Sequence, residues 1–123
     1  MTQKPLILIV EDTKEHSDLF IKLLNHFGYS YSLEETGQGA LAFCAKTVPT
    51  LILMDISLPD ISGIQVMLTL KALETFQKVP IIALSAYSSD NLLKQGSKGL
   101  FDDYLSKPFT IEEFLNKIKK HLD

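Results

Sequence analysis

The chain has 123 residues, enough for one folded domain and too few for two, and its 46% hydrophobic and 22% charged residues are typical of a soluble globular protein. Its net charge of -3 supplies no basic surface to attract nucleic acid, and its apolar runs are far shorter than the ~20 residues that a bilayer span needs. We therefore expect a single domain over residues 1–123, located in the cytoplasm, without nucleic-acid or membrane partners.

Strand-like and helix-like segments alternate along the whole chain. Continuous apolar runs at 6–10, 51–54 and 81–84 are typical of central parallel strands that are buried on both faces. The runs at 29–33 and 101–105 mix apolar and polar residues, so we expect them at the two edges of the sheet. This alternation of strands and helices predicts an α/β fold in which helices cover both faces of a doubly wound, five-stranded parallel sheet of order 2-1-3-4-5.

Helical signals fill the segments between these strands. The first helix is predicted to end at Gly28. Its buried face comprises four apolar residues with helical spacing, namely Phe20, Leu23, Leu24 and Phe27. Ser62 and Thr110 each precede a Gln or Glu by three residues, which is capping-box spacing and predicts the starts of the third and last helices. The helix from Ser88 to Gly96 should be weakly held and movable, because that segment is short and polar.

Acidic residues follow two of the predicted inner strands. Glu11 and Asp12 come directly after the first strand, and Asp55 comes after the third. Ligands of such sheets bind outside the carboxyl ends of the strands where the strand order reverses, which is between these two strands. Three crowded carboxylates repel one another unless a cation joins them, and oxygen-only ligands favour Mg²⁺ over zinc. The sequence therefore predicts a magnesium site there.

Phosphate chemistry is the natural partner of such a site, since Mg²⁺ commonly binds one or two carboxylates together with phosphate oxygens. An aspartate can attack phosphorus to form an aspartyl phosphate, and Asp55 is the best-placed candidate. Ser85 and Lys107 follow the fourth and fifth strands, so a hydroxyl and an ammonium should reach the same edge. Lys107 precedes Pro108, where we expect a cis peptide bond that aims the lysine inward.

Together these motifs resemble a response-regulator receiver domain. They are the acidic pair after LILIV, Asp55 in LILMDISLPDISG, Ser85 in IIALSA and Lys107 in DYLSKPF. The resemblance covers essentially the whole chain and implies a flavodoxin-like fold in a single-domain member of two-component or phosphorelay signalling. It also implies that Asp55 accepts phosphate from the phosphohistidine of a histidine kinase or a histidine phosphotransfer protein.

The resemblance further implies how the metal is held. Asp12, Asp55 and the backbone carbonyl of Ser57 would bind Mg²⁺, and Glu11 would assist through water. Glu11 stands where aspartate is frequent in the family, and Ser85 stands where threonine is frequent, but neither change removes the functional group.

A conformational switch is the remaining implication of the resemblance. Ser85 would hydrogen-bond the new phosphoryl group, Lys107 would pair with it, and Tyr104 would turn inward as Ser85 moves. The surface formed by the fourth helix, the fifth strand and the last helix would then change and control binding to a downstream protein. Such a chain is a phosphoacceptor switch that assists its own phosphorylation and dephosphorylation, not an enzyme with turnover.

Three other functions compete with this interpretation. An aspartyl-phosphate phosphohydrolase usually needs a second aspartate two residues after the first, where this chain has Ser57. A flavin-binding electron carrier of the same strand order needs a phosphate-binding loop after Val10, and none is evident. A receiver-like interaction module that is never phosphorylated would not need to retain Asp55, Ser85 and Lys107.

The remaining polar residues have simpler interpretations. Asp12 has the spacing to cap the first helix together with Glu15, which is compatible with metal binding. Cys44, the only cysteine, falls in a helix-like stretch and is interpreted as a small core residue. The three histidines lack metal-ligand spacing and are predicted to be surface residues without a function: His16, His26 and His121.

Overall fold

The computed structural model describes residues 5–85 and 101–122, and the helix predicted from Ser88 to Gly96 lies outside them. The strands are β1 (Leu6–Val10), β2 (Ser30–Glu34), β3 (Leu51–Asp55), β4 (Ile81–Ser85) and β5 (Asp103–Ser106). The helices are α1 (Lys14–His26), α2 (Gly37–Cys44), α3 (Gly63–Lys71) and α5 (Ile111–Leu122), with a short 3-10 helix η1 (Glu74–Phe76) after α3. Among these described helices, none has the length and apolar character needed to cross a membrane.

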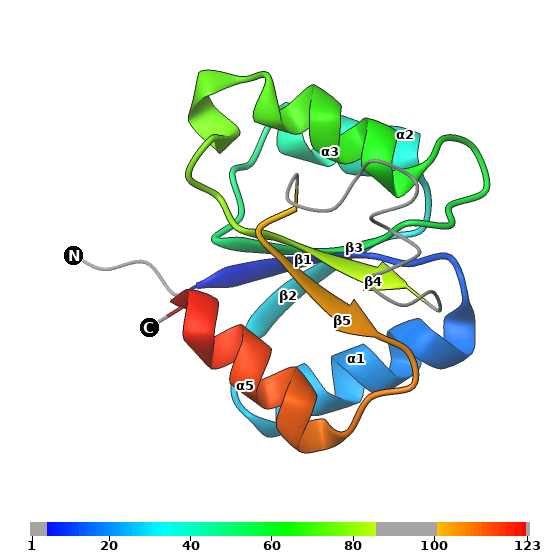
Figure 1. The fold of residues 1–123 in the computed structure, drawn as a ribbon, viewed down its shortest axis with the longest axis vertical. Coiled ribbons are helices and arrows are strands. Elements are labelled where there is room, and N and C mark those ends of the chain that lie inside the picture. Colours follow the sequence, from blue (N-terminus) through cyan, green and yellow to red (C-terminus); the bar gives the residue numbers. More distant parts are fainter. Residues whose placement is uncertain (1–4, 86–100, 123) are drawn as a thin grey trace.

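All five strands are parallel and lie in the order β2-β1-β3-β4-β5, which confirms the predicted topology. The three inner strands are almost wholly buried, whereas β2 and β5 at the edges are only partly buried. Figure 1 shows α2 and α3 on one face of the sheet and α1 and α5 on the other. The chain therefore forms three layers, as the alternation of strands and helices predicts.

The core is divided in two by the sheet. Because successive side chains of a strand point to opposite faces, β1 sends Leu8 and Val10 toward α2 and α3, and Ile7 and Ile9 toward α1 and α5. Cys44 packs in the first of these clusters and is 6% exposed, which confirms that it is a core residue.

The ends of α1 differ from the prediction in two places. Phe20, Leu23 and Leu24 are buried as expected, but Phe27 is 38% exposed because it lies just beyond the last helical residue. Gly28 adopts a φ of 79°, the left-handed conformation that glycine allows at a helix end. The N-cap residue is Thr13, so the proposal that Asp12 caps this helix is wrong.

Ser62 and Thr110 cap α3 and α5 as predicted, but only α5 has the complete capping box. The Thr110 N–H donates to Glu113 Oε1 at 3.3 Å and the Glu113 N–H donates to Thr110 Oγ1 at 3.0 Å, which is a complete capping box. Ser62 is the N-cap of α3, but its Oγ accepts from the N–H of Ile64 at 3.1 Å rather than from Gln65. A single capping bond therefore replaces the predicted box at α3.

Candidate functional site

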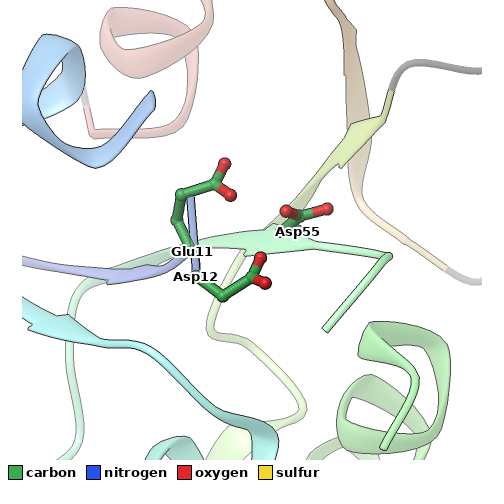
Figure 2. A group of neighbouring side chains, drawn as sticks. All are labelled: Glu11, Asp12 and Asp55. Carbon is green, nitrogen blue, oxygen red and sulfur yellow. The ribbon is translucent and has the colours of Figure 1, made fainter. Parts of the chain in front are cut away.

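Three carboxylates meet at the carboxyl end of the sheet. Figure 2 shows Glu11 and Asp12 at the end of β1 reaching toward Asp55 at the end of β3. One carboxylate oxygen from each residue lies within 4.8 Å of the other two, close enough for the three to share one metal ion. Glu11 and Asp55 are 0% and 5% exposed, while Asp12 faces the solvent. This chemistry fits Mg²⁺, which prefers carboxylate oxygen and water ligands.

Asp55 is a buried acid with an unusual proton affinity. Burial and the neighbouring Glu11 carboxyl group raise the pKa of Asp55 to about 6, even though the Ser57 N–H and Lys107 act to lower it. Its Oδ1 accepts the Ser57 N–H at 2.9 Å, and its Oδ2 lies 3.6 Å from Lys107 Nζ. A divalent cation among these carboxylates would favour the ionised and nucleophilic form of Asp55.

Lys107 crosses from the end of β5 to the carboxylates. Its backbone N–H donates to the carbonyl of Ser85 at 2.7 Å, which fixes the segment after β5 beside β4. The peptide bond between Lys107 and Pro108 is cis, as predicted. The Nζ atom donates to Glu11 Oε1 at 2.7 Å, so the Lys107 ammonium group lies close to both Glu11 and Asp55.

Ser85 and Tyr104 lie near one another on neighbouring strands. Ser85 ends β4 and is 4% exposed, and the β4–β5 register pairs Ala83 with Tyr104 and Ser85 with Ser106. The Tyr104 ring is half-buried on the α2–α3 side of the sheet and meets Phe101 edge to face, with 6.0 Å between ring centroids. Ser85 therefore lies at the carboxyl edge of the sheet and Tyr104 within β5, two residues before its end.

The loop between β3 and α3 carries Ser57 and is anchored at both ends. The Gly63 N–H donates to the carbonyl of Ile56 at 2.9 Å, and a Cβ at position 63 would collide with the backbone carbonyl of Asp55. In the middle of the loop, Asp60 accepts two backbone N–H bonds of 2.8 Å each from Gly37 and Gln38 at the start of α2. These bonds lower the pKa of Asp60.

Sequence reasoning missed the anchoring role of Asp60. An acid beside the first amides of a helix is favourable, but the sequence separates these partners by more than twenty residues, and the pairing depends on the fold. The one available signal is that Asp60 follows Pro59, a pair of residues that favours a turn but also fits a plain loop.

All three histidines were predicted to be surface residues without a function, and two of them contact charged side chains. The His16 side chain is 46% exposed, yet its Nδ1 lies 3.0 Å from Lys107 Nζ and 3.6 Å from Glu11 Oε1. His121 is only 14% exposed, because its Nε2 lies 2.9 Å from the carboxylate of Asp103 between α5 and β5. His26 is exposed as predicted. Helical position alone did not reveal these contacts, since both depend on packing against another element.

An apolar groove borders the site on the side of α1. It has a volume of about 410 Å³ and lies between α1 and the segment that joins β5 to α5. Its lining residues are His16, Leu19, Phe20, Lys107, Pro108 and Phe109. Two of these lining residues pack on each other, since the Phe109 ring stacks on Phe20 with 5.5 Å between centroids, and Leu19 is 45% exposed.

Comparison with known proteins gives a consistent result over nearly the full chain. Residues 7–119 match the family described as response regulator receiver domain. The polar-differentiation response regulator DivK of Brucella ovis is 34% identical over 116 residues, which cover 94% of each chain.

Solved structures with the same fold include metal-bound receivers. The receiver domain of a sensor histidine kinase from Pseudomonas aeruginosa, with a magnesium ion coordinated in its active-site cleft, has a TM-score of 0.88 and 29% identity, covering 97% of this chain and 98% of that one. The response regulator TrrA from Thermotoga maritima, in complex with Mg²⁺-BeF, has a TM-score of 0.86 and 30% identity, covering 96% and 99%. The chain therefore belongs to the response-regulator receiver family, as its motifs indicate.

Proposed function

We propose that Mg²⁺-dependent phosphorylation of Asp55 by a phosphohistidine donor switches this receiver between two states that bind partners differently. The observation that carries the proposal is the convergence of Glu11, Asp12 and Asp55 within 4.8 Å, with Lys107 Nζ 3.6 Å from Asp55. A phosphoacceptor needs this combination, because a buried carboxylate must react with a group that is itself negatively charged.

Asp55 is the nucleophile of the proposed reaction. A carboxylate oxygen of Asp55 forms the new bond to phosphorus, and the bond between phosphorus and the donor imidazole nitrogen breaks with its electron pair returning to that nitrogen. Lys107 offers a positive charge to the transferred oxygens, and Ser85, at the end of the neighbouring strand, offers a hydroxyl.

Mg²⁺ would be held by Asp12, Asp55 and the backbone carbonyl of Ser57, with Glu11 assisting through water. When bound, the ion supplies positive charge that offsets the carboxylates and the transferred phosphoryl group. The exposed Asp12 and Ser57 leave this side of the site open to solvent, as an ion that keeps several water ligands requires. Two solved relatives that contain Mg²⁺ support the assignment.

The groove beside α1 is the approach that we assign to the donor, which is a histidine kinase or a histidine phosphotransfer protein. Lys107 lines both the groove and the site, so a donor seated on Leu19 and Phe109 would present its phosphohistidine next to Asp55. Receiver domains of histidine kinases are among the structural relatives, which supports this class of partner.

Ser85 and Tyr104 are the proposed switch. A bond from the Ser85 hydroxyl to the phosphoryl group would draw the end of β4 toward Asp55 and make room for the half-buried Tyr104 ring to turn inward. The affected surface would comprise β5, α5 and the helix predicted from Ser88 to Gly96, which lies outside the described residues, and it would bind a downstream protein target. Moving such a switch from nearly off to nearly on takes roughly 5.5 kcal/mol, so several contacts must act together.

Incubation with acetyl phosphate and Mg²⁺ tests the proposal, with intact-protein mass spectrometry as the measurement. The wild type should gain one phosphoryl group, and Asp55→Asn or removal of Mg²⁺ should abolish the gain. Asp18→Asn is the matched control, because it removes an exposed acid from α1 outside the site. Phosphorylation of Asp55→Asn would contradict the proposal. Sustained turnover of small phosphate esters would also contradict it and would indicate a phosphohydrolase.

A further inference from the structure

The Lys107 ammonium group has three N–H donors, and two of them have close acceptors. Glu11 Oε1 lies 2.7 Å from Nζ and His16 Nδ1 lies 3.0 Å from it. Asp55 Oδ2 is farther away, at 3.6 Å. Glu11 and His16 therefore hold the ammonium group beside the phosphoacceptor, and Asp55 itself contributes less to holding it.

His16 must be the acceptor in its contact with Lys107, because a lysine ammonium group can only donate. The bond uses the unprotonated Nδ1 and leaves the ring proton on Nε2. His16 lies in the first turn of α1, and 46% of its side chain remains open to solvent at the rim of the site. The same side chain therefore contacts Lys107 and lines the groove.

Glu11 provides a second and more rigid acceptor for Lys107. Its side chain is fully buried, and while Oε1 accepts from Lys107, Oε2 accepts the backbone N–H of Thr13 at 3.3 Å. The carboxylate is thereby fixed at both oxygens. Acceptors on two different elements, the end of β1 and the first turn of α1, restrict the ammonium group more than Glu11 alone would.

We propose that His16 is a positioning residue for Lys107. Together with Glu11 it occupies two of the three N–H donors, so that the third is directed at Asp55 and at the phosphoryl group formed there. The inference rests on the proposed function, because it assigns His16 a part in the phosphorylation of Asp55. It differs from a simple surface role in that the effect of His16 on the reaction with a small donor passes through Lys107.

The test measures the rate of Asp55 phosphorylation by acetyl phosphate in four variants: His16→Ala, His16→Asn, Lys107→Ala and the double variant His16→Ala with Lys107→Ala. A small donor is used because His16 also lines the groove, so a protein donor would mix docking with positioning. Asn is the matched control, since its side-chain oxygen branches from Cγ as Nδ1 does and can accept the same bond.

His16→Ala should slow phosphorylation by about threefold to fivefold, the range for a half-exposed bond to a charged group. His16→Asn should restore most of the rate, and His16→Ala should have no further effect once Lys107 is alanine. The Mg²⁺ affinity should stay unchanged, and the NMR signal of the Lys107 ammonium group should shift in His16→Ala but much less in His16→Asn.

Three results would overturn the inference while leaving the proposed function intact: an unchanged or faster rate in His16→Ala, no rescue by Asn, or the same slowing when Lys107 is absent. A wild-type protein that takes up no phosphoryl group at Asp55 would overturn the proposed function, and the inference about His16 with it.

Discussion

Replacing Asp55 by asparagine should stabilise the metal-free protein, although it removes the proposed phosphoacceptor. The pKa of Asp55 is raised from 3.8 to about 6, chiefly by burial and by the Glu11 carboxyl group. The folded state therefore binds the Asp55 proton more tightly than the unfolded state does. Ionising this group costs stability as the pH rises from about 4 to about 6, and the full cost is present above that window.

The shift of roughly two pKa units sets an upper limit of about 3 kcal/mol on the gain at neutral pH. The asparagine oxygen can still accept the Ser57 N–H, but the attraction between Lys107 and the Asp55 carboxylate is lost. We therefore expect Asp55→Asn to raise the free energy of unfolding by about 1–3 kcal/mol near pH 7.5, and by much less near pH 4.5.

Urea unfolding followed by circular dichroism, in the presence of EDTA, measures this difference at both pH values. Saturating Mg²⁺ should stabilise the wild type more than the variant, and at about 100 times the wild-type dissociation constant it would add about 2.7 kcal/mol to the wild type and narrow the gap. Asp18→Asn, an exposed acid on the same chain, should change little. A variant that is less stable than the wild type near neutral pH, or a gain that does not shrink on acidification, would refute the reasoning.

Three further substitutions test other parts of the structure. Asp12→Ala should weaken Mg²⁺ binding by about tenfold or more in a calorimetric titration, and an unchanged affinity would exclude Asp12 as a ligand. Although burial opposes it, bonds from Lys117 and His121 lower the pKa of Asp103. Asp103→Asn should therefore lower the free energy of unfolding, measured with urea near neutral pH, by about 1–2 kcal/mol. This difference should fade as the pH falls below about 4. If these contacts do not form in solution, the difference should be absent at every pH. Thr110→Ala should lower stability by about 1 kcal/mol through loss of the α5 cap, whereas Thr110→Ser should not, and equal loss in both would argue against the capping bond.

The strand order and the meeting of the acids could be predicted because they depend on local signals and one general rule. Apolar runs identify the inner strands, and the carboxyl ends of parallel strands share one edge, so Glu11, Asp12 and Asp55 must come together. Lys107 follows from the same rule applied to the fifth strand. No knowledge of side-chain packing is needed for any of these steps.

The contacts that could not be predicted depend on how helices and loops sit against the sheet. His16 meets Lys107 only because the first turn of α1 faces the end of β5, and Asp60 meets the start of α2 only because the two loops pack together. For Phe27 the sequence predicted burial that the structure does not show. Its spacing places it on the apolar face, but the helix ends one residue earlier and the ring is left partly in solvent.

Gly63 has a consequence for how sequence variation in this chain should be interpreted. Because the start of α3 approaches the backbone of Asp55 so closely that no side chain fits between them, position 63 sets the spacing between that helix and the proposed phosphoacceptor carboxylate. One added methyl group would displace Asp55 relative to Lys107 without touching either side chain, and bond-making geometry tolerates only small displacements. In a survey of random mutants, position 63 would therefore be as intolerant as a residue that performs chemistry, although it contributes no chemical group.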